Sequence, residues 1–441
     1  MTNIVRFAPS PTGRIHIGNA RTAILNWLMA RKSGGQFILR YDDTDLARST
    51  QDYADGIATD IAWLGITPDR VEWQSKRFDR YNDVVARLKA EGKLYPCYET
   101  ADELDRRRKR QEARGGLRTY DRAALKLTAE ERADWEAKGR KPHWRFKLDQ
   151  RVIEWNDLIR GPQHTDLASQ SDPVLVREDG SYLYTLPSVI DDIDFGITHV
   201  IRGEDHVTNA GVQVAITEAL GGKPPIYAHH SLLVGSDGKG LSKRLGSLSI
   251  ASMREAGLEP MAVVSHAALL GTSDNIHPCA DIQELVDGFD LAKISRAPGR
   301  FDEKDLEALN AKLLHMLPWN AVKHRLPDQT EAFWLAIRGN IEKFSETEFW
   351  DDVIQQDLKI DPAAEDVAFI ATARAALPLE PWDGTTWKTW TETVKATTDR
   401  KGKALFMPLR MVLTGMEHGP ELAALLPLIG RQRALDRMGL L

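Results

Sequence analysis

The N-terminal segment constrains the fold of this chain more than any other part. It begins with a short β-prone run, Ile4–Ala8, which the proline- and glycine-rich segment Pro9–Gly13 ends. A helix is predicted to follow His16–Asn19, because apolar residues then recur at helical spacing. Gln36–Tyr41 is predicted to be a second strand, and a Ser49 or Thr50 cap is expected to start a second helix. This alternation of strand and helix predicts an α/β fold built on a parallel sheet.

Farther along the chain, this alternation is interrupted and then resumes. Residues Thr100–Lys147 carry 15 Lys and Arg against 9 Asp and Glu, a local net charge of +6 in a chain whose total is −6. The α/β pattern resumes near Tyr182. From about Phe301 onward nearly every segment suits a helix, including residues 302–314, 331–343, 363–376 and 419–438. We therefore expect an α/β domain that is split by a basic insertion and followed by a helical domain.

Composition excludes several classes of protein. Cys97 and Cys279 are the only cysteines and lie far apart, which argues against a disulfide scaffold or a cysteine-based zinc site. No apolar run approaches the roughly 18 residues of a membrane span, and residues 1–10 lack the apolar core of a signal peptide. The total charge excludes a uniformly basic surface for nucleic acid, although not a local basic patch. We expect a soluble, cytoplasmic protein without a membrane or DNA partner.

The loop before the first predicted helix is a candidate phosphate site. It lacks the spacing of the two commonest phosphate-binding motifs, GxxxxGKS/T and GxGxxG. A helix start is nevertheless suited to phosphate, because unpaired backbone N–H groups and the positive end of the helix dipole meet there. Gly18 would let a phosphate approach closely, and His16 and Asn19 would donate hydrogen bonds to it. The alternative is a Pro/Gly turn whose histidine faces solvent.

A second loop runs from Gly235 to Arg244 and ends in the triplet Ser242-Lys243-Arg244. Its three glycines suggest mobility, and a mobile lysine is suited to stabilising a pyrophosphate leaving group. Taken alone, this loop is equally well explained as a flexible surface hairpin whose charges favour solubility. The two loops together favour nucleotide chemistry.

The two loops also carry a family resemblance. His16–Asn19 (HIGN) resembles the HIGH signature of class I aminoacyl-tRNA synthetases, and Gly240–Arg244 (GLSKR) resembles their KMSKS loop. Further strings are similar to bacterial glutamyl-tRNA synthetases and extend over essentially the whole chain: Arg6–Gly13, Leu39–Asp45, Ile201–His206, Phe289–Asn310 and Arg400–Leu422. The glutaminyl branch would be expected to read more like PPEPNG at Ala8–Gly13.

The resemblance implies a fold and an activity. The fold would be a Rossmann-type catalytic domain split by a connective insertion and followed by an all-α anticodon-binding domain. The expected parts are a first catalytic half (residues 1–80), an acceptor-stem-binding insertion (81–181), a second catalytic half (182–235), a stem-contact region with the KMSKS-like loop (236–310) and the helical domain (311–441). The enzyme would use ATP with Mg²⁺ to activate L-glutamate and would transfer it to the 3′ terminal adenosine of tRNA(Glu), with tRNA(Gln) left open as a second substrate. We expect a monomer.

The resemblance also assigns site residues. His16 and Lys243 would be catalytic. Glutamate would be bound by seven residues: Arg6, Ala8, Ser10, Asp42, Tyr184, Ser188 and Arg202. ATP would be bound by the two loops and one acidic residue: Pro9, Thr12, Gly13, His16, Gly18, Asn19, Glu204, Leu241, Ser242, Lys243 and Arg244. Within these sets, Arg6 would pair with the side-chain carboxylate of glutamate, a contact that suits a forked guanidinium, and Asp42 would take the α-amino group.

This sequence departs from the family pattern at three places. The family usually has glutamate where Asp42 stands, so the carboxylate is one methylene shorter, and an asparagine is often found where Ser188 stands. The lysine loop reads GLSKR rather than KMSKR. Some relatives carry a cysteine-rich zinc site in the insertion, but Cys97 is the only cysteine of this one, so we predict no zinc.

Several other features keep two interpretations. The basic block Arg106, Arg107, Arg108, Lys109 and Arg110 is either a solvated helix face or a contact to the RNA backbone. The tryptophans of the C-terminal part are expected to be core residues, and the alternative is that they stack on the bases of an anticodon. Asp191, Asp192, Asp194, Glu204, Asp205 and His206 could form a metal cluster, but such strings also arise from turns and ion pairs, so no dedicated metal site is expected. His229 and His230 are expected to end a strand, with contact to a nucleotide as the alternative. A catalytically altered paralogue that binds or modifies RNA stays the alternative to the ligase.

Overall fold

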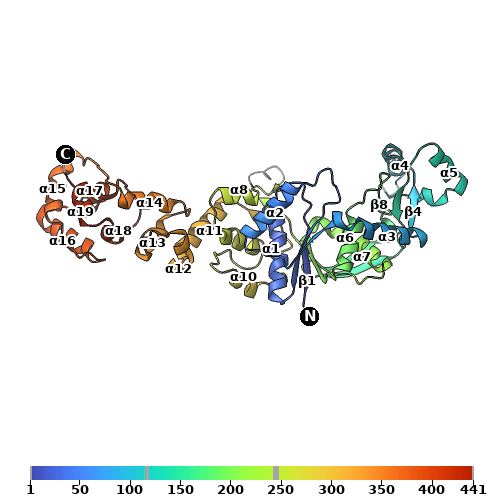
Figure 1. Ribbon diagram of the computed structural model, residues 1–441, viewed down its shortest axis with the longest axis horizontal. Coiled ribbons are helices and arrows are strands. Elements are labelled where there is room, and N and C mark those ends of the chain that lie inside the picture. Colours follow the sequence, from blue (N-terminus) through green and yellow to red (C-terminus); the bar gives the residue numbers. More distant parts are fainter. Residues whose placement is uncertain (1, 114, 116–118, 242–247, 440–441) are drawn as a thin grey trace. The chain divides into compact units, whose positions relative to one another are not determined.

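A computed structural model describes residues 2–113, 115, 119–241 and 248–439 (Figure 1). The chain forms two compact units. The first comprises Met1–Glu255, Val264–His277 and Asp281–Asp302, and the second comprises Ala256–Val263, Pro278–Ala280 and Glu303–Leu441. Among the described residues, no helix combines the length and apolar character needed to cross a lipid bilayer.

A parallel sheet lies at the centre of the first unit. Strand β1 (Ile4–Phe7) pairs with β2 (Gln36–Tyr41), which pairs with β3 (Arg70–Trp73), and β9 (His199–Gly203) pairs with β10 (Ile226–His230). The two sets of strands meet where the Ile4 N–H donates to Thr198 Oγ1 and the Thr198 N–H donates to the Ile4 carbonyl, both at 2.9 Å. Five residues of β2 are buried, as expected for a parallel strand that is covered on both faces.

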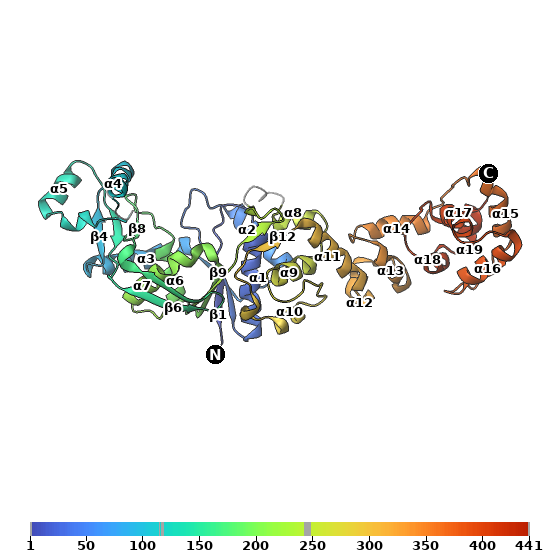
Figure 2. The same cartoon turned by 180° about the vertical axis from the view of Figure 1, so that it is seen from behind.

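Helices cover this sheet, and local signals fix their ends. They are α1 (Ile17–Lys32), α2 (Gln51–Trp63), α6 (Thr185–Asp194) and α7 (Val207–Ala219). Figure 2 shows α1 beside β1 and β9. His16 caps the start of α1 and the Thr50 hydroxyl caps α2, so the predicted first helix and one of the two proposed caps of the second are confirmed.

Residues between β3 and α6 form a separate set of elements. They begin with α3 (Phe78–Ala90) and include an antiparallel sheet of β4 (Leu94–Cys97), β5 (His143–Phe146) and β8 (Val174–Val176). The helices α4 (Ala101–Ala113) and α5 (Ala129–Ala137) bury no residue. A hairpin of β6 (Val152–Asp157) and β7 (Gly161–Asp166) completes this part, and the Leu158 N–H donates to the Tyr227 carbonyl of β10 at 2.9 Å.

Two short strands and three helices lie in the part of the chain that alternates between the two units, and α9 has residues in both. Strand β11 (Leu233–Gly235) runs parallel to β12 (Gly299–Phe301). Helices α8 (Ile250–Glu255), α9 (Pro260–Leu269) and α10 (Ile282–Gly288) lie between them in the chain.

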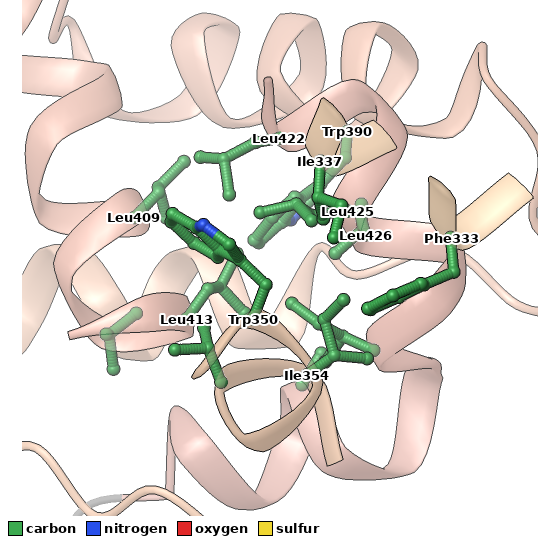
Figure 3. Packing of buried hydrophobic residues seen from close by; sticks show 14 of the residues in the cluster. Phe333, Ile337, Trp350, Ile354, Trp390, Leu409, Leu413, Leu422, Leu425 and Leu426 are labelled. Carbon is green, nitrogen blue, oxygen red and sulfur yellow. The ribbon is translucent and has the colours of Figure 1, made fainter. Parts of the chain in front are cut away.

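The described residues of the second unit form helices joined by loops, with no strand among them. Its helices are α11 (Glu303–Met316), α12 (Trp319–Val322), α13 (Glu331–Ile337), α14 (Glu346–Gln355), α15 (Val367–Ala375), α16 (Thr386–Thr398), α17 (Lys403–Thr414), α18 (Leu422–Ile429) and α19 (Arg431–Arg437). Trp350 and Trp390 pack among leucines in its core (Figure 3). Trp334 and Trp390 are fully buried, and their indole N–H groups donate to the carbonyls of Leu317 and Ala373, both at 2.8 Å. The prediction that these tryptophans are core residues is confirmed.

Candidate active site

The start of α1 positions His16 as a hydrogen-bond donor. Its Nδ1 accepts from the Gly18 N–H at 3.1 Å, and Asn19 Oδ1 accepts from the His16 N–H at 3.5 Å, which together form a capping box. Burial lowers the pKa of His16, so the imidazole is neutral at pH 7. A neutral imidazole whose Nδ1 is an acceptor carries its proton on Nε2. The helix start therefore offers an Nε2–H donor next to the positive end of the helix dipole, an arrangement that suits a phosphate.

Backbone hydrogen bonds hold the second loop on both sides of Ser242-Lys243-Arg244. On the N-terminal side of this triplet, Val234 pairs with Gly240, and the Gly235 N–H donates to the Lys239 carbonyl at 2.8 Å. After it, the Leu248 carbonyl accepts from the Ile17 N–H at 3.0 Å. Ser242, Lys243 and Arg244 themselves lie outside the described residues. The chain therefore leaves this loop directly beside the helix start that His16 caps.

A cluster of charged side chains lies at the carboxyl ends of β1 and β2. Arg40 is 1% exposed and holds both oxygens of Asp42, with Nε to Oδ1 at 2.6 Å and Nη2 to Oδ2 at 3.1 Å. It also donates to Asp192 at 2.8 Å, and Arg6 reaches the same carboxylate through Nε at 3.2 Å. Burial raises the pKa of Asp192, but the Arg6 and Arg40 guanidiniums outweigh burial and bring it below its usual value. Ser188 Oγ lies 3.4 Å from Asp42 Oδ2. Three predicted site residues, Arg6, Asp42 and Ser188, are thus brought together.

Arg202 differs from the other buried arginines of this cluster. It is 8% exposed, and no described carboxylate oxygen lies within 4.0 Å of its guanidinium nitrogens. Its Nε donates to His229 Nε2 at 3.0 Å, and its Nη2 donates to the His206 carbonyl at 3.3 Å. A buried cation is costly unless an anion compensates it. This geometry leaves Arg202 able to bind an anionic ligand.

Comparison with known proteins decides the family. Residues 3–308 match the family described as tRNA synthetases class I (E and Q), catalytic domain, and residues 339–440 match an anticodon binding domain. The glutamate–tRNA ligase 1 of Brucella ovis and that of Brucella abortus strain 2308 are each 57% identical to the chain, over 99% of it and 100% of theirs. The chain belongs to the glutamate–tRNA ligases. The predicted class I fold and the predicted enzyme class are thereby confirmed, and nothing in these matches supports the altered paralogue.

Solved structures of glutamate–tRNA ligases superpose on the whole chain. That of the Elizabethkingia meningosepticum ligase, determined in complex with its amino acid, has a TM-score of 0.85 at 27% identity and covers 99% of this chain and 98% of its own. That of Elizabethkingia anophelis has a TM-score of 0.82 at 28% identity, with 99% of both chains covered.

The other residues expected to serve the ligase lie around these groups. Ser10 and Thr12 are exposed on the first loop. The Pro9 carbonyl of this loop accepts from the Asp42 N–H at 3.0 Å. Ala8 and Gly13 lie on the same loop, and Asn19 lies at the helix start. Tyr184 is 43% exposed and packs edge-on against His206. Glu204 accepts from Arg160 Nη1 at 2.6 Å and from the Leu232 N–H at 3.1 Å, so it is partly engaged, and Leu241 is buried.

Sequence reasoning missed Arg40, whose guanidinium holds this charged cluster together. It is the one charged side chain in an otherwise buried run of β2, and that is the signal that could have revealed it. The aspartates of α6 form ion pairs: Asp191 accepts from Arg77 Nε at 2.7 Å and Asp194 accepts from Arg80 Nε at 2.9 Å.

The predicted basic block lies on α4 of the insertion. Arg107 pairs with Asp121 at 3.0 Å and Lys109 with Asp105 at 2.8 Å, while Arg106 donates to the Asp102 carbonyl. Arg106, Arg108 and Arg110 are exposed and have no ion-pair partner among the described residues. Three of the five cations are therefore available to a ligand.

One group of potential metal ligands was not anticipated. Cys97, Glu99 and His143 each place one donor atom within 4.8 Å of the others. The Tyr120 hydroxyl donates to Glu99 Oε1 at 2.7 Å and lies 3.7 Å from Cys97 Sγ, and burial raises the pKa of the Cys97 thiol to about 12. His143 stands 46 positions after Cys97, so sequence spacing gave no sign of this group.

Replacing Gly18 with alanine is expected to slow adenylate formation by about 10- to 100-fold if His16 has the role that the family resemblance implies, because a misplaced catalytic group carries a cost of this order. The added Cβ would lie 2.9 Å from His16 Cε1 and 3.0 Å from His16 Nδ1, and would push the imidazole aside. Single-turnover kinetics would measure the effect. Gly56→Ala in α2 is the matched control, since no atom beyond its own chain neighbours and the adjacent helix backbone lies within 4 Å of its new Cβ. Equal rates in the two variants would contradict this role of Gly18.

Proposed function

We propose that this chain activates L-glutamate with ATP and transfers the glutamyl group to the 3′ terminal adenosine of tRNA(Glu). The observation that carries the substrate assignment is the buried, unpaired guanidinium of Arg202 beside the cluster of Arg6, Arg40, Asp42 and Asp192. These five side chains sum to one positive charge, which complements the net negative charge of glutamate.

Within this pocket, each end of glutamate has a fitting partner. Arg6 uses Nε and Nη2 on Asp192 and keeps Nη1 for the side-chain carboxylate of glutamate, which Arg202 also faces in our proposal. Asp42 takes the α-amino group. Its shorter side chain is held by Arg40 and Ser188, so its position is fixed despite the missing methylene. Ala8, Ser10 and Tyr184 would contact the remainder of the bound glutamate.

ATP would lie across the helix start, with its phosphates at His16, Gly18 and Asn19. The loop residues Pro9, Thr12 and Gly13, together with Glu204 and Leu241, would surround the nucleotide. Lys243, with Ser242 and Arg244, would neutralise the charge that develops on the pyrophosphate leaving group. Because arginines occupy the nearby carboxylates Asp42 and Asp192, Mg²⁺ is expected to enter on the phosphates as their counter-ion. Catalysis then depends on positioning and charge stabilisation without a protein nucleophile.

We propose that tRNA contacts several parts of the chain. The insertion (residues 81–181) would bind the acceptor stem, residues 236–310 would contact the stem, and the helical residues 311–441 would bind the anticodon. We also propose that the ligase is monomeric and cytoplasmic, a location that suits a chain with only two cysteines, both buried.

Replacing Arg106, Arg108 and Arg110 with glutamine is expected to reduce the salt dependence of tRNA binding. If each arginine neutralises one phosphate, the slope of log K against log salt should become less negative by roughly 0.9 per arginine. Binding measured by filter retention or fluorescence at several salt concentrations would test this. Lys138→Gln on α5 is the control, because Lys138 already pairs with Asp134. An unchanged slope would mean that the block is a solvated helix face.

The purified protein is expected to contain much less than one equivalent of zinc. Cys97, Glu99 and His143 are only three donors, and the Tyr120 hydroxyl already donates to Glu99, whereas structural zinc sites use four ligands as a rule. Metal analysis of protein expressed in zinc-supplemented medium would measure this. One equivalent that Cys97→Ser removes would contradict the prediction.

Aminoacylation of purified tRNA(Glu) and tRNA(Gln) with glutamate tests the proposed function. Glutamyl-tRNA(Glu) formation that requires ATP is the expected result. Charging of tRNA(Gln) as well would extend the substrate range, whereas charging of neither tRNA would overturn the proposal.

A further inference from the structure

Three buried side chains form a hydrogen-bonded series that ends at Arg202. Asp157 ends β6 of the insertion, His229 lies on β10 and Arg202 lies on β9; they are 1%, 0% and 8% exposed. His229 Nδ1 lies 2.5 Å from Asp157 Oδ2, and Arg202 Nε lies 3.0 Å from His229 Nε2. Because Arg202 makes no ion pair with a described residue, His229 is its main side-chain partner.

Backbone structure fixes this series at both ends. Arg202 and His229 are register partners on the parallel strands β9 and β10. Tyr227 stacks on the His229 ring with centroids 5.7 Å apart and an interplanar angle of 11°. The Asp157 carboxylate also accepts the N–H groups of Ile159 and Arg160, at 3.0 and 2.9 Å. The imidazole therefore has little freedom to rotate.

The hydrogen bonds allow one tautomer of His229. Arg202 Nε–H is always a donor, so His229 Nε2 must accept. Asp157 is an acceptor, so His229 Nδ1 must carry the proton. Burial lowers the pKa of His229, which favours this neutral form. With Nε engaged here and Nη2 on the His206 carbonyl, Arg202 Nη1 has no partner among the described residues.

We propose that Asp157 and His229 position the Arg202 guanidinium so that its Nη1, the nitrogen without a partner among the described residues, faces the carboxylate of the amino-acid substrate. His229 and Asp157 are positioning residues that act through Arg202, and they join the insertion to the amino-acid pocket. This inference rests on the proposed function, in which Arg202 binds glutamate. It extends the determinants of glutamate binding to a residue of the insertion.

Asp157→Asn tests the series because it keeps the size of the side chain. If the asparagine oxygen keeps its bonds to the Ile159 and Arg160 N–H groups, its NH₂ group faces His229 Nδ1. The imidazole then carries its proton on Nε2 instead of Nδ1. Its Nε2–H would face the Arg202 Nε–H, so two donors would meet and the hydrogen bond between them would be lost. A carboxylate-to-amide replacement beside a histidine is known to cause this change of tautomer. We expect KM for glutamate to rise by about 10- to 100-fold, the range for a lost hydrogen bond to a charged group, with KM for ATP within about twofold of wild type.

A second variant and a matched control separate positioning from stability. His229→Gln can offer an amide oxygen to Arg202, so adding it to Asp157→Asn is expected to restore part of the glutamate affinity. Asp172→Asn removes an equally buried carboxylate of the insertion, which accepts from Tyr95 and Arg122, and should lower the melting temperature without raising KM for glutamate. An unchanged KM for glutamate in Asp157→Asn, or parallel rises for glutamate and ATP, would overturn the inference. Wild-type protein that fails to charge any tRNA with glutamate would instead overturn the proposed function.

Discussion

Replacing His16 with asparagine is expected to slow glutamyl-adenylate formation by about 10²- to 10³-fold, the cost of losing one donor that stabilises transition-state charge. Asparagine is a strong N-cap, so its Oδ1 can accept the Gly18 N–H as His16 Nδ1 does. It is too short to place a donor where Nε2–H lies. Rapid-quench measurement of adenylate formation and a thermal melt should therefore show a large loss of rate with a nearly unchanged melting temperature.

His16→Ala is the control for this variant. Alanine removes both the donor and the cap, so the rate should fall as far, and stability should fall by about 1 kcal/mol as well. A fast His16→Asn variant with a slow His16→Ala variant would show that His16 only caps α1. If both variants form adenylate as fast as wild type, His16 takes no part in adenylate formation.

Replacing Arg202 with leucine is expected to raise KM for glutamate by about 10²-fold or more, since truncating one member of a buried charge pair costs several kcal/mol. The effect on the free energy of unfolding should be small. Arg202 is buried without an anion among the described residues, and its replacement removes the desolvation cost of that buried charge. We expect the melting temperature to stay within about 1 °C of wild type, which corresponds to roughly 1 kcal/mol in a protein of this size.

Arg202→Lys separates charge from geometry. Lysine keeps the positive charge but lacks the fork that donates to His229 and a carboxylate together. KM for glutamate should lie between that of wild type and that of Arg202→Leu. If Arg202→Leu binds glutamate as wild type does, another residue must bind the side-chain carboxylate.

Local signals made the first loop and its helix predictable. The strand was expected at Ile4–Ala8 and lies at Ile4–Phe7, and the helix expected after His16–Asn19 begins at Ile17. Thr50 caps the second helix. Each of these depends on residues within one turn of the boundary, so the sequence pattern carries the information.

The same local sequence patterns could not predict tertiary contacts. Arg40 and Asp192 are 152 positions apart and meet only because β1 and β2 pair in parallel and α6 packs above them. The family resemblance supplied Arg6, Asp42 and Ser188 as a set, but it did not indicate that Arg40 holds them together. The predicted helix over residues 419–438 is wrong as a single element, because Gly430 adopts φ 79° and ψ 157°, outside the helical region, and separates α18 from α19.

ATP–pyrophosphate exchange in the presence of tRNA(Glu), with L-glutamate, L-glutamine and L-aspartate compared in parallel, tests the glutamate assignment most directly. The buried positive charge at Arg202 and Arg6 predicts exchange with glutamate and exchange with glutamine that is lower by at least about 10³-fold, because an uncharged amide leaves the arginine unpaired. Exchange that is equal for glutamine and glutamate, or absent with glutamate, would contradict a pocket built for the carboxylate.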